Sequence, residues 1–281
     1  MGKLGTNPER GVDRVPSDVK TDVLIDLTEA EVAPATKPAV DLDLHRWSDW
    51  MPRVSLVIPT MNEASNLPHV LPRIPTWVAE VIIVDGQSTD DTVGVATSLI
   101  PDAIVIHQTG SGKGDAMRLG FEAATGDIIA SIDADGSMDP AELHVFVGQL
   151  MAGADFVKGS RFAQGGGTVD MEIHRKMGNW GLVRLTRLLF GQRYSDLCYG
   201  YMAFWRRALD IINPDSEGFE IEALMNARAL RARLKIAEVP SFEARRIHGV
   251  SNLKTFRDGW RILSTLLSER FTRQDPPASA K

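Results

Sequence analysis

Residues 128–135 read IIASIDAD, an apolar run that ends in two carboxylates. Short apolar runs of this kind are typical of strands that are buried on both faces of a sheet. Alternate residues of an extended strand project to the same side, so Asp133 and Asp135 would face the same way if the strand continued through them. Two like charges held close together repel one another unless a cation neutralises them, and carboxylate oxygens suit Mg²⁺ or Mn²⁺. The stretch predicts a buried strand that ends at a divalent metal site, with a solvated acidic turn as the alternative.

The same alternation of short apolar runs and longer amphipathic stretches surrounds this strand, which predicts an α/β fold with a mostly parallel sheet flanked by helices. In the first half we predict strands at 54–58, 80–84, 103–107, 127–132 and 155–159, and helices at 63–71, 113–124 and 140–151. In the second half we predict helices at 171–190, 219–234 and 255–268, and strands at 200–205 and 236–239. Ligands of such sheets bind at the carboxyl ends of the strands.

The chain has 281 residues, 43% of them hydrophobic, which is enough for one sizeable domain. We expect a single domain over residues 51–270, preceded by a partly disordered extension over 1–50 and followed by a disordered tail over 271–281. Residues 1–155 contain 10 Lys+Arg and 24 Asp+Glu, a net charge of −14, whereas residues 156–281 contain 21 and 13, a net charge of +8. The basic part favours contact with phosphate groups or an anionic surface.

The sequence shows no secretory leader and no apolar run of the ~20 residues that span a bilayer. We therefore expect a cytoplasmic location, with peripheral contact to the inner face of the membrane as an open expectation. Phe256, Trp260, Leu263 and Leu267 fall on one stripe of the last predicted helix. This stripe would suit a bilayer interface, but we favour packing on the domain core. The single cysteine, Cys198, excludes an intrachain disulfide, and we expect it to be a small buried apolar residue.

Two further polar motifs follow predicted strands. They read IPTMNE at residues 58–63 and VDGQSTDD at residues 84–91. Carboxylates and hydroxyls there can accept hydrogen bonds from a nucleobase and a ribose. We interpret Asp85 as a ligand of this kind, and we interpret Ser88, Thr89 and Asp91 as residues that begin the next helix.

The segment GSGKG at residues 110–114 resembles a phosphate loop, but His107 and Gly114 stand where that motif requires Gly and Ser or Thr. It remains a glycine-rich loop that leads to a helix N-terminus beside Lys113, which is a suitable site for an anion. A calcium loop over residues 133–139 is excluded because Met138 occupies the position that needs glycine.

Taken together, the motifs IPTMNE, VDGQSTDDT, GKGDAMRLGFEAATGDIIASIDAD and VKGSRF resemble glycosyltransferase family two, which has the Rossmann-like GT-A fold. The chain is similar over residues 54–267 to dolichol-phosphate mannosyltransferases and bacterial polyprenyl-phosphate glycosyltransferases. Four ordered motifs are far more specific than any one of them. The resemblance implies an inverting, metal-dependent transfer of a hexose from a GDP-mannose or UDP-glucose type of donor to a polyprenyl phosphate.

The resemblance also implies roles for individual residues on the donor side. Pro59, Glu63 and Asp85 would hold the nucleoside. Lys113 and Asp133 would lie near the diphosphate and the sugar as catalytic residues. The metal, Mg²⁺ or Mn²⁺, would be bound by Asp133 and Asp135.

On the acceptor side, the resemblance implies that Arg161 and Arg175 face the acceptor phosphate and that Arg246 clamps the diphosphate, a role that suits the planar guanidinium. Asp196 stands where family members place an acid near the acceptor. It would be either a catalytic base or a positioning group, because a phosphate acceptor is already ionised and needs no base.

The chain departs from the family pattern at Gly86 and Gln87, where Asp-Gly is common, and at Ser137, where the dolichol type often has Gln. Two alternative functions remain open: a glycosyltransferase that acts on a hydroxyl of a glycan or small metabolite, and a sugar-nucleotide binding protein without turnover. All three hypotheses predict a sugar-nucleotide partner, and none involves nucleic acid.

Overall fold

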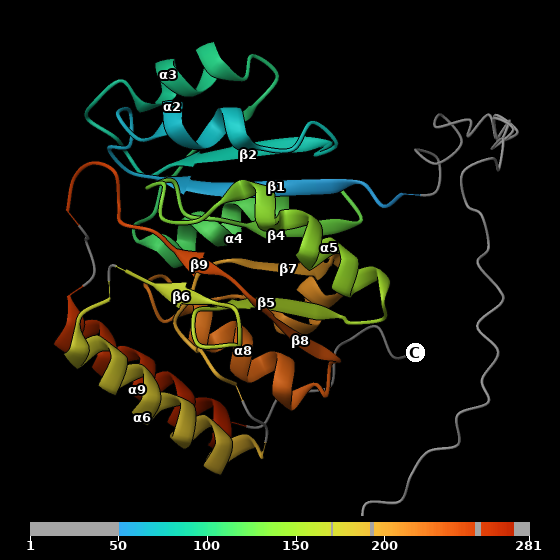
Figure 1. Cartoon of the computed structure of the whole chain (residues 1–281), viewed down its shortest axis with the longest axis vertical. Coiled ribbons are helices and arrows are strands. Elements are labelled where there is room, and N and C mark those ends of the chain that lie inside the picture. The colour runs from blue at the N-terminus through green and yellow to red at the C-terminus, as the bar shows by residue number, and fades with distance from the viewer. Residues whose placement is uncertain (1–50, 170, 192–193, 251–253, 273–281) are drawn as a thin grey trace, which may run out of the picture. The chain divides into compact units, whose positions relative to one another are not determined.

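The computed structural model describes residues 51–169, 171–191, 194–250 and 254–272. The predicted extension over 1–50 and nearly all of the predicted tail lie outside these residues. Figure 1 shows a central sheet with helices packed on both sides of it. The predicted α/β class with a mostly parallel, helix-flanked sheet is therefore confirmed.

The main sheet has seven strands in the order β3-β2-β1-β4-β7-β5-β8. Its strands are β1 (Val54–Thr60), β2 (Glu80–Asp85), β3 (Ile104–His107), β4 (Ile128–Ser131), β5 (Phe156–Ser160), β7 (Met202–Trp205) and β8 (Ile236–Pro240). All neighbouring pairs are parallel except those that β7 makes with β4 and β5. A second, two-stranded parallel sheet joins β6 (Gly167–Thr168) to β9 (Phe242–Glu243).

Two layers of helices cover the sheet, and a third group lies to one side of it. One face packs against α2 (Leu67–Val70), α3 (Thr92–Leu99) and α5 (Leu143–Met151). The other face packs against α4 (Lys113–Ala123), α7 (Leu209–Ile212) and α8 (Ile221–Arg231). The long helices α6 (Ile173–Phe190) and α9 (Thr255–Phe271) pack with α8 in a separate apolar cluster. Short 3₁₀ turns complete the described elements: η1 (Leu71–Arg73), η2 (Pro140–Glu142) and η3 (Arg206–Ala208).

Coverage of β1 on both faces explains why its middle is a continuous apolar run. Leu56 and Ile58 belong to the core on one face, whereas Val57 belongs to the core on the other, and all three are fully buried. A strand that is covered on both faces is apolar at most positions, and the buried Ser55 is accommodated because its hydroxyl donates a hydrogen bond to Glu80 and accepts one from the Gly126 N–H. The polar residues that follow the strand are therefore free to serve a site at its carboxyl end.

Two predictions about helices were wrong. The helix predicted at 63–71 begins only at Leu67, because Pro68 lacks an N–H and is accepted only in the first turn of a helix.

The apolar stripe predicted on the last helix, which includes Phe256 and Trp260, does not pack on the core. Phe256 is 91% exposed and Trp260 is 70% exposed, while α9 buries Ile262 and Leu266 instead.

Candidate active site

A pocket lies where the carboxyl ends of β1, β2 and β4 meet. Its volume is about 490 Å³. Pro59 and Thr60 from β1 line it, together with Gly86 and Gln87 after β2 and the segment 133–135 after β4. Parallel strands bring their carboxyl ends to one edge of the sheet, and this is why motifs far apart in the sequence meet here.

The two acidic residues of the central motif lie in a turn rather than on an extended strand. β4 ends at Ser131, and Ala134 and Asp135 form a turn. The Asp135 carboxylate accepts a hydrogen bond of 2.9 Å from the Ser137 backbone N–H. Gly136 has a φ of +79°, and a Cβ there would lie 2.5 Å from Cδ1 of Ile247. Glycine thus permits both the turn and the close approach of the segment after β9.

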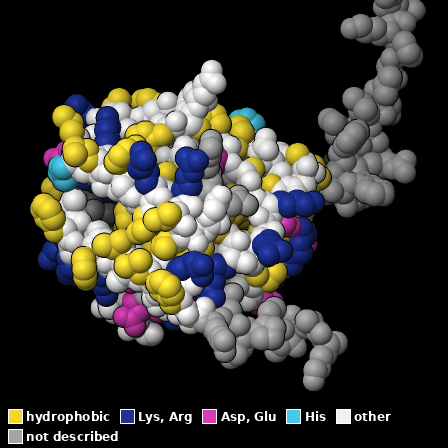
Figure 2. All heavy atoms as spheres, turned by 90° about the horizontal axis from the view of Figure 1, so that it is seen from below, with side chains coloured by type: hydrophobic (Ala, Val, Ile, Leu, Met, Phe, Trp, Pro, Cys, Tyr) yellow, Lys and Arg dark blue, Asp and Glu magenta, His cyan; other side chains and the backbone are white. Residues whose placement is uncertain are grey.

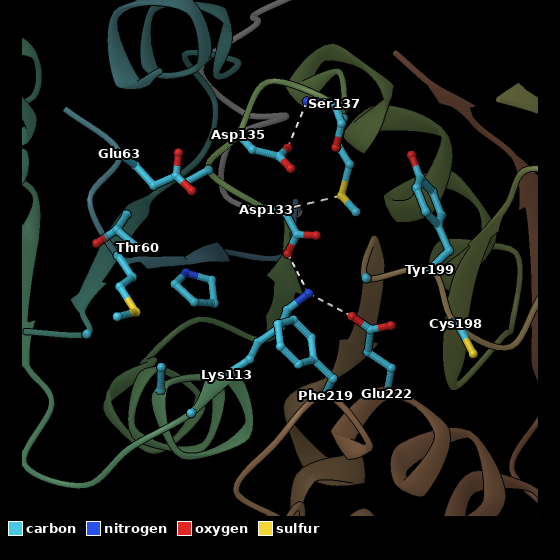
Figure 3. Close-up of a pocket in the computed structure, with 18 of the residues that line it drawn as sticks. Thr60, Glu63, Lys113, Asp133, Asp135, Ser137, Cys198, Tyr199, Phe219 and Glu222 are labelled. Atoms are coloured by element: carbon cyan, nitrogen blue, oxygen red, sulfur yellow. Dashed lines mark hydrogen bonds and ion pairs between the residues drawn. The ribbon is translucent and has the colours of Figure 1, made fainter. Parts of the chain in front are cut away.

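Lys113 lies between two carboxylates on the floor of the pocket (Figure 3). Its Nζ atom is 2.6 Å from Oδ1 of Asp133 and 2.7 Å from Oε1 of Glu222. Burial alone would lower the pKa of Lys113, but the charges of Asp133 and Glu222 outweigh burial and raise that pKa above its ordinary value. Lys113 is therefore a permanent cation placed directly beside the predicted metal-binding carboxylate.

Arg246 pairs with the second carboxylate of the motif. Its Nη2 atom is 2.9 Å from Oδ2 of Asp135, and its Nη1 atom donates a 2.9 Å hydrogen bond to Oε1 of Glu63. Asn66 holds this arrangement from the other side, since it contacts Glu63 and exchanges hydrogen bonds with the His248 backbone. The predicted donor-side residues Glu63, Asp135 and Arg246 are thus brought together.

A second ionic cluster lies deeper, around Arg161. The guanidinium donates two hydrogen bonds to Asp196, at 2.6 and 2.9 Å, and one of 2.9 Å to Glu243. It also donates a hydrogen bond of 3.3 Å to the Cys198 carbonyl and lies over the Tyr199 ring. The Arg161 side chain is only 2% exposed. Most of its donors are therefore already used within the protein.

Asp196 is completely buried and is not among the residues that line the pocket. Burial would raise the pKa of Asp196, but hydrogen bonds and charge from Arg161 outweigh burial and hold that pKa below its ordinary value. Of the two roles predicted for Asp196, this geometry favours positioning over catalysis by proton transfer, because a base must reach the acceptor. The buried Lys158 next to this cluster donates a 3.0 Å hydrogen bond to the Tyr199 carbonyl, and burial lowers its pKa.

The remaining predicted residues divide between the pocket and its surroundings. Arg175, on α6, lines the pocket. Asp85 is buried next to it and accepts hydrogen bonds of 3.3 Å from the Ser88 backbone N–H, while Gly86 and Gln87 supply the lining surface. Cys198 lines the pocket, and burial raises the pKa of its thiol to about 12, so it is a neutral thiol.

Three site features were not predicted from the sequence. Glu222 and Glu243 pair with Lys113 and Arg161, and both line the pocket. At Gly200, an added Cβ would lie 2.8 Å from Oε1 of Glu222 and 3.0 Å from Nζ of Lys113, so glycine lets the backbone pass close to this pair. A signal for Glu222 was present: FEIE, at residues 219–222, places two acids at the start of a predicted helix.

Two negative findings apply to the part of the chain that the structure describes. Within it, no three His, Cys, Asp or Glu side chains gather in a way that could hold a metal ion. Within the same residues, every helix is too short or too polar to cross a bilayer.

Comparison with solved structures supports the fold. Glucosyl-3-phosphoglycerate synthase from Mycobacterium tuberculosis, solved in complex with Mn²⁺, UDP and glucosyl-3-phosphoglycerate, superposes with a TM-score of 0.63. The match covers 82% of this chain and 84% of that chain, with 24% sequence identity. At this identity the likeness concerns the fold, which is GT-A as predicted.

Comparison of sequences identifies the family as well as the fold. Undecaprenyl-phosphate mannosyltransferase of Micrococcus luteus is 34% identical over 200 residues, which are 67% of this chain and 82% of that protein. Polyprenol monophosphomannose synthase of Mycolicibacterium smegmatis is 32% identical over 214 residues, which are 72% of this chain and 81% of that protein. The model of glycosyl transferase family 2 matches residues 55–211. The chain belongs to glycosyl transferase family 2 and is a glycosyltransferase.

Proposed function

We propose that this glycosyltransferase moves a hexose from a nucleoside-diphosphate sugar to a polyprenyl phosphate, with inversion at the sugar carbon. One observation carries the proposal: two carboxylates, Asp133 and Asp135, and two cations, Lys113 and Arg246, share one pocket at the carboxyl end of the sheet. Basic side chains bind diphosphate oxygens directly, and a carboxylate-bound metal ion neutralises the charge that develops on a departing diphosphate. The names of two relatives, which specify undecaprenyl phosphate and polyprenol monophosphomannose, support the choice of acceptor.

The acidic pair fits a small divalent cation of the Mg²⁺ or Mn²⁺ type. Asp133 is 30% exposed, so part of its carboxylate faces the open pocket. Mg²⁺ commonly binds through one or two carboxylates, with substrate phosphates and waters as the other ligands. Two protein carboxylates are therefore sufficient for a site that the donor completes. When bound, the cation would neutralise charge on the departing diphosphate.

Lys113 and Arg246 orient the donor in this proposal. Both are held by carboxylates in the pocket, and both can turn their remaining N–H groups toward phosphate oxygens. Pro59 and Glu63 contribute to the wall where the nucleoside would lie, beside Gly86 and Gln87. Asp85 acts from behind this wall by holding the turn at Ser88.

The acceptor phosphate must be oriented toward the sugar, but it does not need a base to remove a proton. Arg175 and Arg257 line the pocket from α6 and α9 and would attract a phosphate monoester, which is already ionised. An acceptor phosphate oxygen would form a bond to the anomeric carbon while the bond from that carbon to the diphosphate oxygen breaks. The nucleoside diphosphate leaves with the electron pair. Arg161 and Asp196 would hold the Cys198–Tyr199 wall in place.

The test is a transfer assay with the purified chain, radiolabelled GDP-mannose or UDP-glucose, Mg²⁺ or Mn²⁺, and a polyprenyl phosphate. We expect label in the lipid fraction with one donor and loss of it in Asp133→Asn. If sugar were transferred only to a hydroxyl acceptor, the proposed polyprenyl phosphate acceptor would be wrong. Binding of donor with neither transfer nor hydrolysis would indicate a non-catalytic sugar-nucleotide binding protein.

A further inference from the structure

The helices α6 and α9 lie side by side (Figure 1). Each of them exposes a stripe of large apolar side chains on the side away from the core. Each stripe recurs at the spacing of one helical face. On α6 it comprises Ile173, Met177, Trp180 and Leu188, and on α9 it comprises Phe256, Trp260, Leu267 and Phe271. All eight side chains are exposed, up to 82% at Leu188 and 91% at Phe256. We call this surface the α6/α9 face.

The fold does not require these side chains to be apolar. The opposite sides of the two helices already pack in the core, through Ile262 and Leu266 of α9 and through Leu182, Val183 and Leu185 of α6. Large contiguous apolar patches are uncommon on monomers and usually mark a surface that another structure covers. We therefore infer that another structure covers the α6/α9 face.

The charges on the two helices limit what that partner can be. Together they carry seven Lys and Arg residues and only two acids, Asp258 and Glu269. Both acids are buried: Asp258 accepts a hydrogen bond from the Lys254 backbone, and Glu269 pairs with Arg228. The exposed acid nearest in sequence is Glu172, directly before α6. Figure 2 shows the hydrophobic side chains of this side gathered among Lys and Arg, with few acidic groups.

We propose that the α6/α9 face docks on the surface of an anionic lipid bilayer. Apolar and aromatic side chains ringed by arginine are the features of a helix that lies in the bilayer interface, where basic residues meet anionic headgroups. Trp180 and Arg184 are already stacked, with the guanidinium 4.7 Å from the ring centre. A second copy of the chain is a poorer partner, because a two-fold interface would set this cationic face against itself.

The docking face adjoins the mouth of the pocket. Arg175 of α6 and Arg257 and Ile262 of α9 line the pocket, while their neighbours Ile173, Met177 and Phe256 point outward. Docking would bring the pocket to the level of the headgroups. If the proposed function holds, the acceptor phosphate reaches the pocket while its chain stays in the bilayer. Docking itself does not depend on that function.

The direct test is flotation of the full chain with vesicles, without any substrate. We expect binding to vesicles of phosphatidylcholine with phosphatidylglycerol, weaker binding to phosphatidylcholine alone, and release by high salt. The double variants Phe256→Ser with Trp260→Ser, and Arg184→Glu with Arg187→Glu, should each lower partitioning by at least about tenfold. Trp77→Ser, an exposed aromatic residue outside the α6/α9 face, is the matched control and should bind as the unaltered chain does.

Absence of binding to the anionic vesicles, or equal binding by all variants, would overturn the proposal. Sedimentation without lipid is the second arm: a dimer that the Phe256→Ser, Trp260→Ser variant dissociates would assign the face to a second copy and overturn lipid docking. Transfer to a short, water-soluble prenyl phosphate should be unchanged in this variant, whereas transfer to a long polyprenyl phosphate in vesicles should fall. If the unaltered chain binds the anionic vesicles and the double variants do not, but no form transfers the sugar, the proposed function is contradicted and docking is supported.

Discussion

Two ionic clusters lie about the pocket, each with one cation between an Asp and a Glu, and they differ in how far the Asp is exposed to solvent. The first joins Lys113 to Asp133 and Glu222, and its Asp133 is 30% exposed. The second joins Arg161 to Asp196 and Glu243, and its Asp196 is completely buried. A partly exposed carboxylate such as Asp133 can exchange partners at a moderate cost, whereas breaking the fully buried Arg161–Asp196 pair leaves an uncompensated charge. The first cluster is therefore suited to ligand exchange, and the second to holding the wall of the site.

The largest expected effect follows from removing the Asp133 charge of the first cluster. Asp133→Asn should lower the transfer rate about 100- to 1000-fold, as loss of one electrostatic contact to the reacting groups typically does. The free energy of unfolding should change less than in Asp196→Asn, because Asp133 is partly exposed and Lys113 keeps Glu222. Initial rates and urea unfolding measure the two effects.

Asp127→Asn is the matched control, since Asp127 lies at the other end of β4 and binds the Arg53 backbone outside the pocket. Its transfer rate should equal that of the unaltered chain. A normal rate in Asp133→Asn would remove Asp133 from the active site.

In the buried cluster around Arg161, a substitution should affect the free energy of unfolding strongly. Asp196→Asn should lower the free energy of unfolding by about 3–5 kcal/mol, because Arg161 would lose its buried partner. Glu243→Gln should cost less, since Asp196 still pairs with Arg161 and Glu243 is 15% exposed. Urea unfolding of both variants tests this order. Unchanged stability with complete loss of turnover in Asp196→Asn would instead assign Asp196 as a base.

A smaller effect should follow from crowding the Lys113–Glu222 pair of the first cluster. Gly200→Ala places a methyl group 2.8 Å from Oε1 of Glu222, so the Lys113–Glu222 pair must shift, and we expect about a tenfold slower transfer. Gly259→Ala on α9 meets no atom within 4 Å and should leave the rate unchanged while slightly stabilising the helix. Equal rates for both variants would show that the position of this pair does not matter to catalysis.

The smallest expected effect is the pH dependence of the buried cluster. The folded-state pKa of Asp196 lies below its ordinary value, so between these two values the unfolded chain binds the proton more readily. The stabilisation is complete above the ordinary pKa of about 4 and is lost as pH falls through the folded-state value. Urea unfolding from pH 5 downward should therefore give a steeper loss in the unaltered chain than in Asp196→Asn. Parallel curves would contradict this.

The sequence predicted the parallel part of the fold well, because strands such as Val54–Thr60 contain a short apolar run and end in polar motifs. It did not predict that β7 is antiparallel to its neighbours, because the pattern of apolar residues in a buried strand does not depend on the direction of the strand. It also missed the partners in the two clusters. Glu222 reaches Lys113 from 109 residues away, and only the packing of α8 beside α4 brings them together. The orientation of α9 was missed for a similar reason: both of its sides carry large apolar residues, and only the packing decides which side faces the core.

The most direct test of the central claim measures nucleotide affinity by calorimetry, with GDP and UDP, in the presence of Mn²⁺ or of a chelator. If Asp133 and Asp135 bind the metal, one nucleotide should bind clearly more tightly with Mn²⁺ to the unaltered chain, and Asp133→Asn and Asp135→Asn should each abolish this gain. Equal affinity with and without the metal, or a gain that survives both substitutions, would contradict metal binding by these two residues.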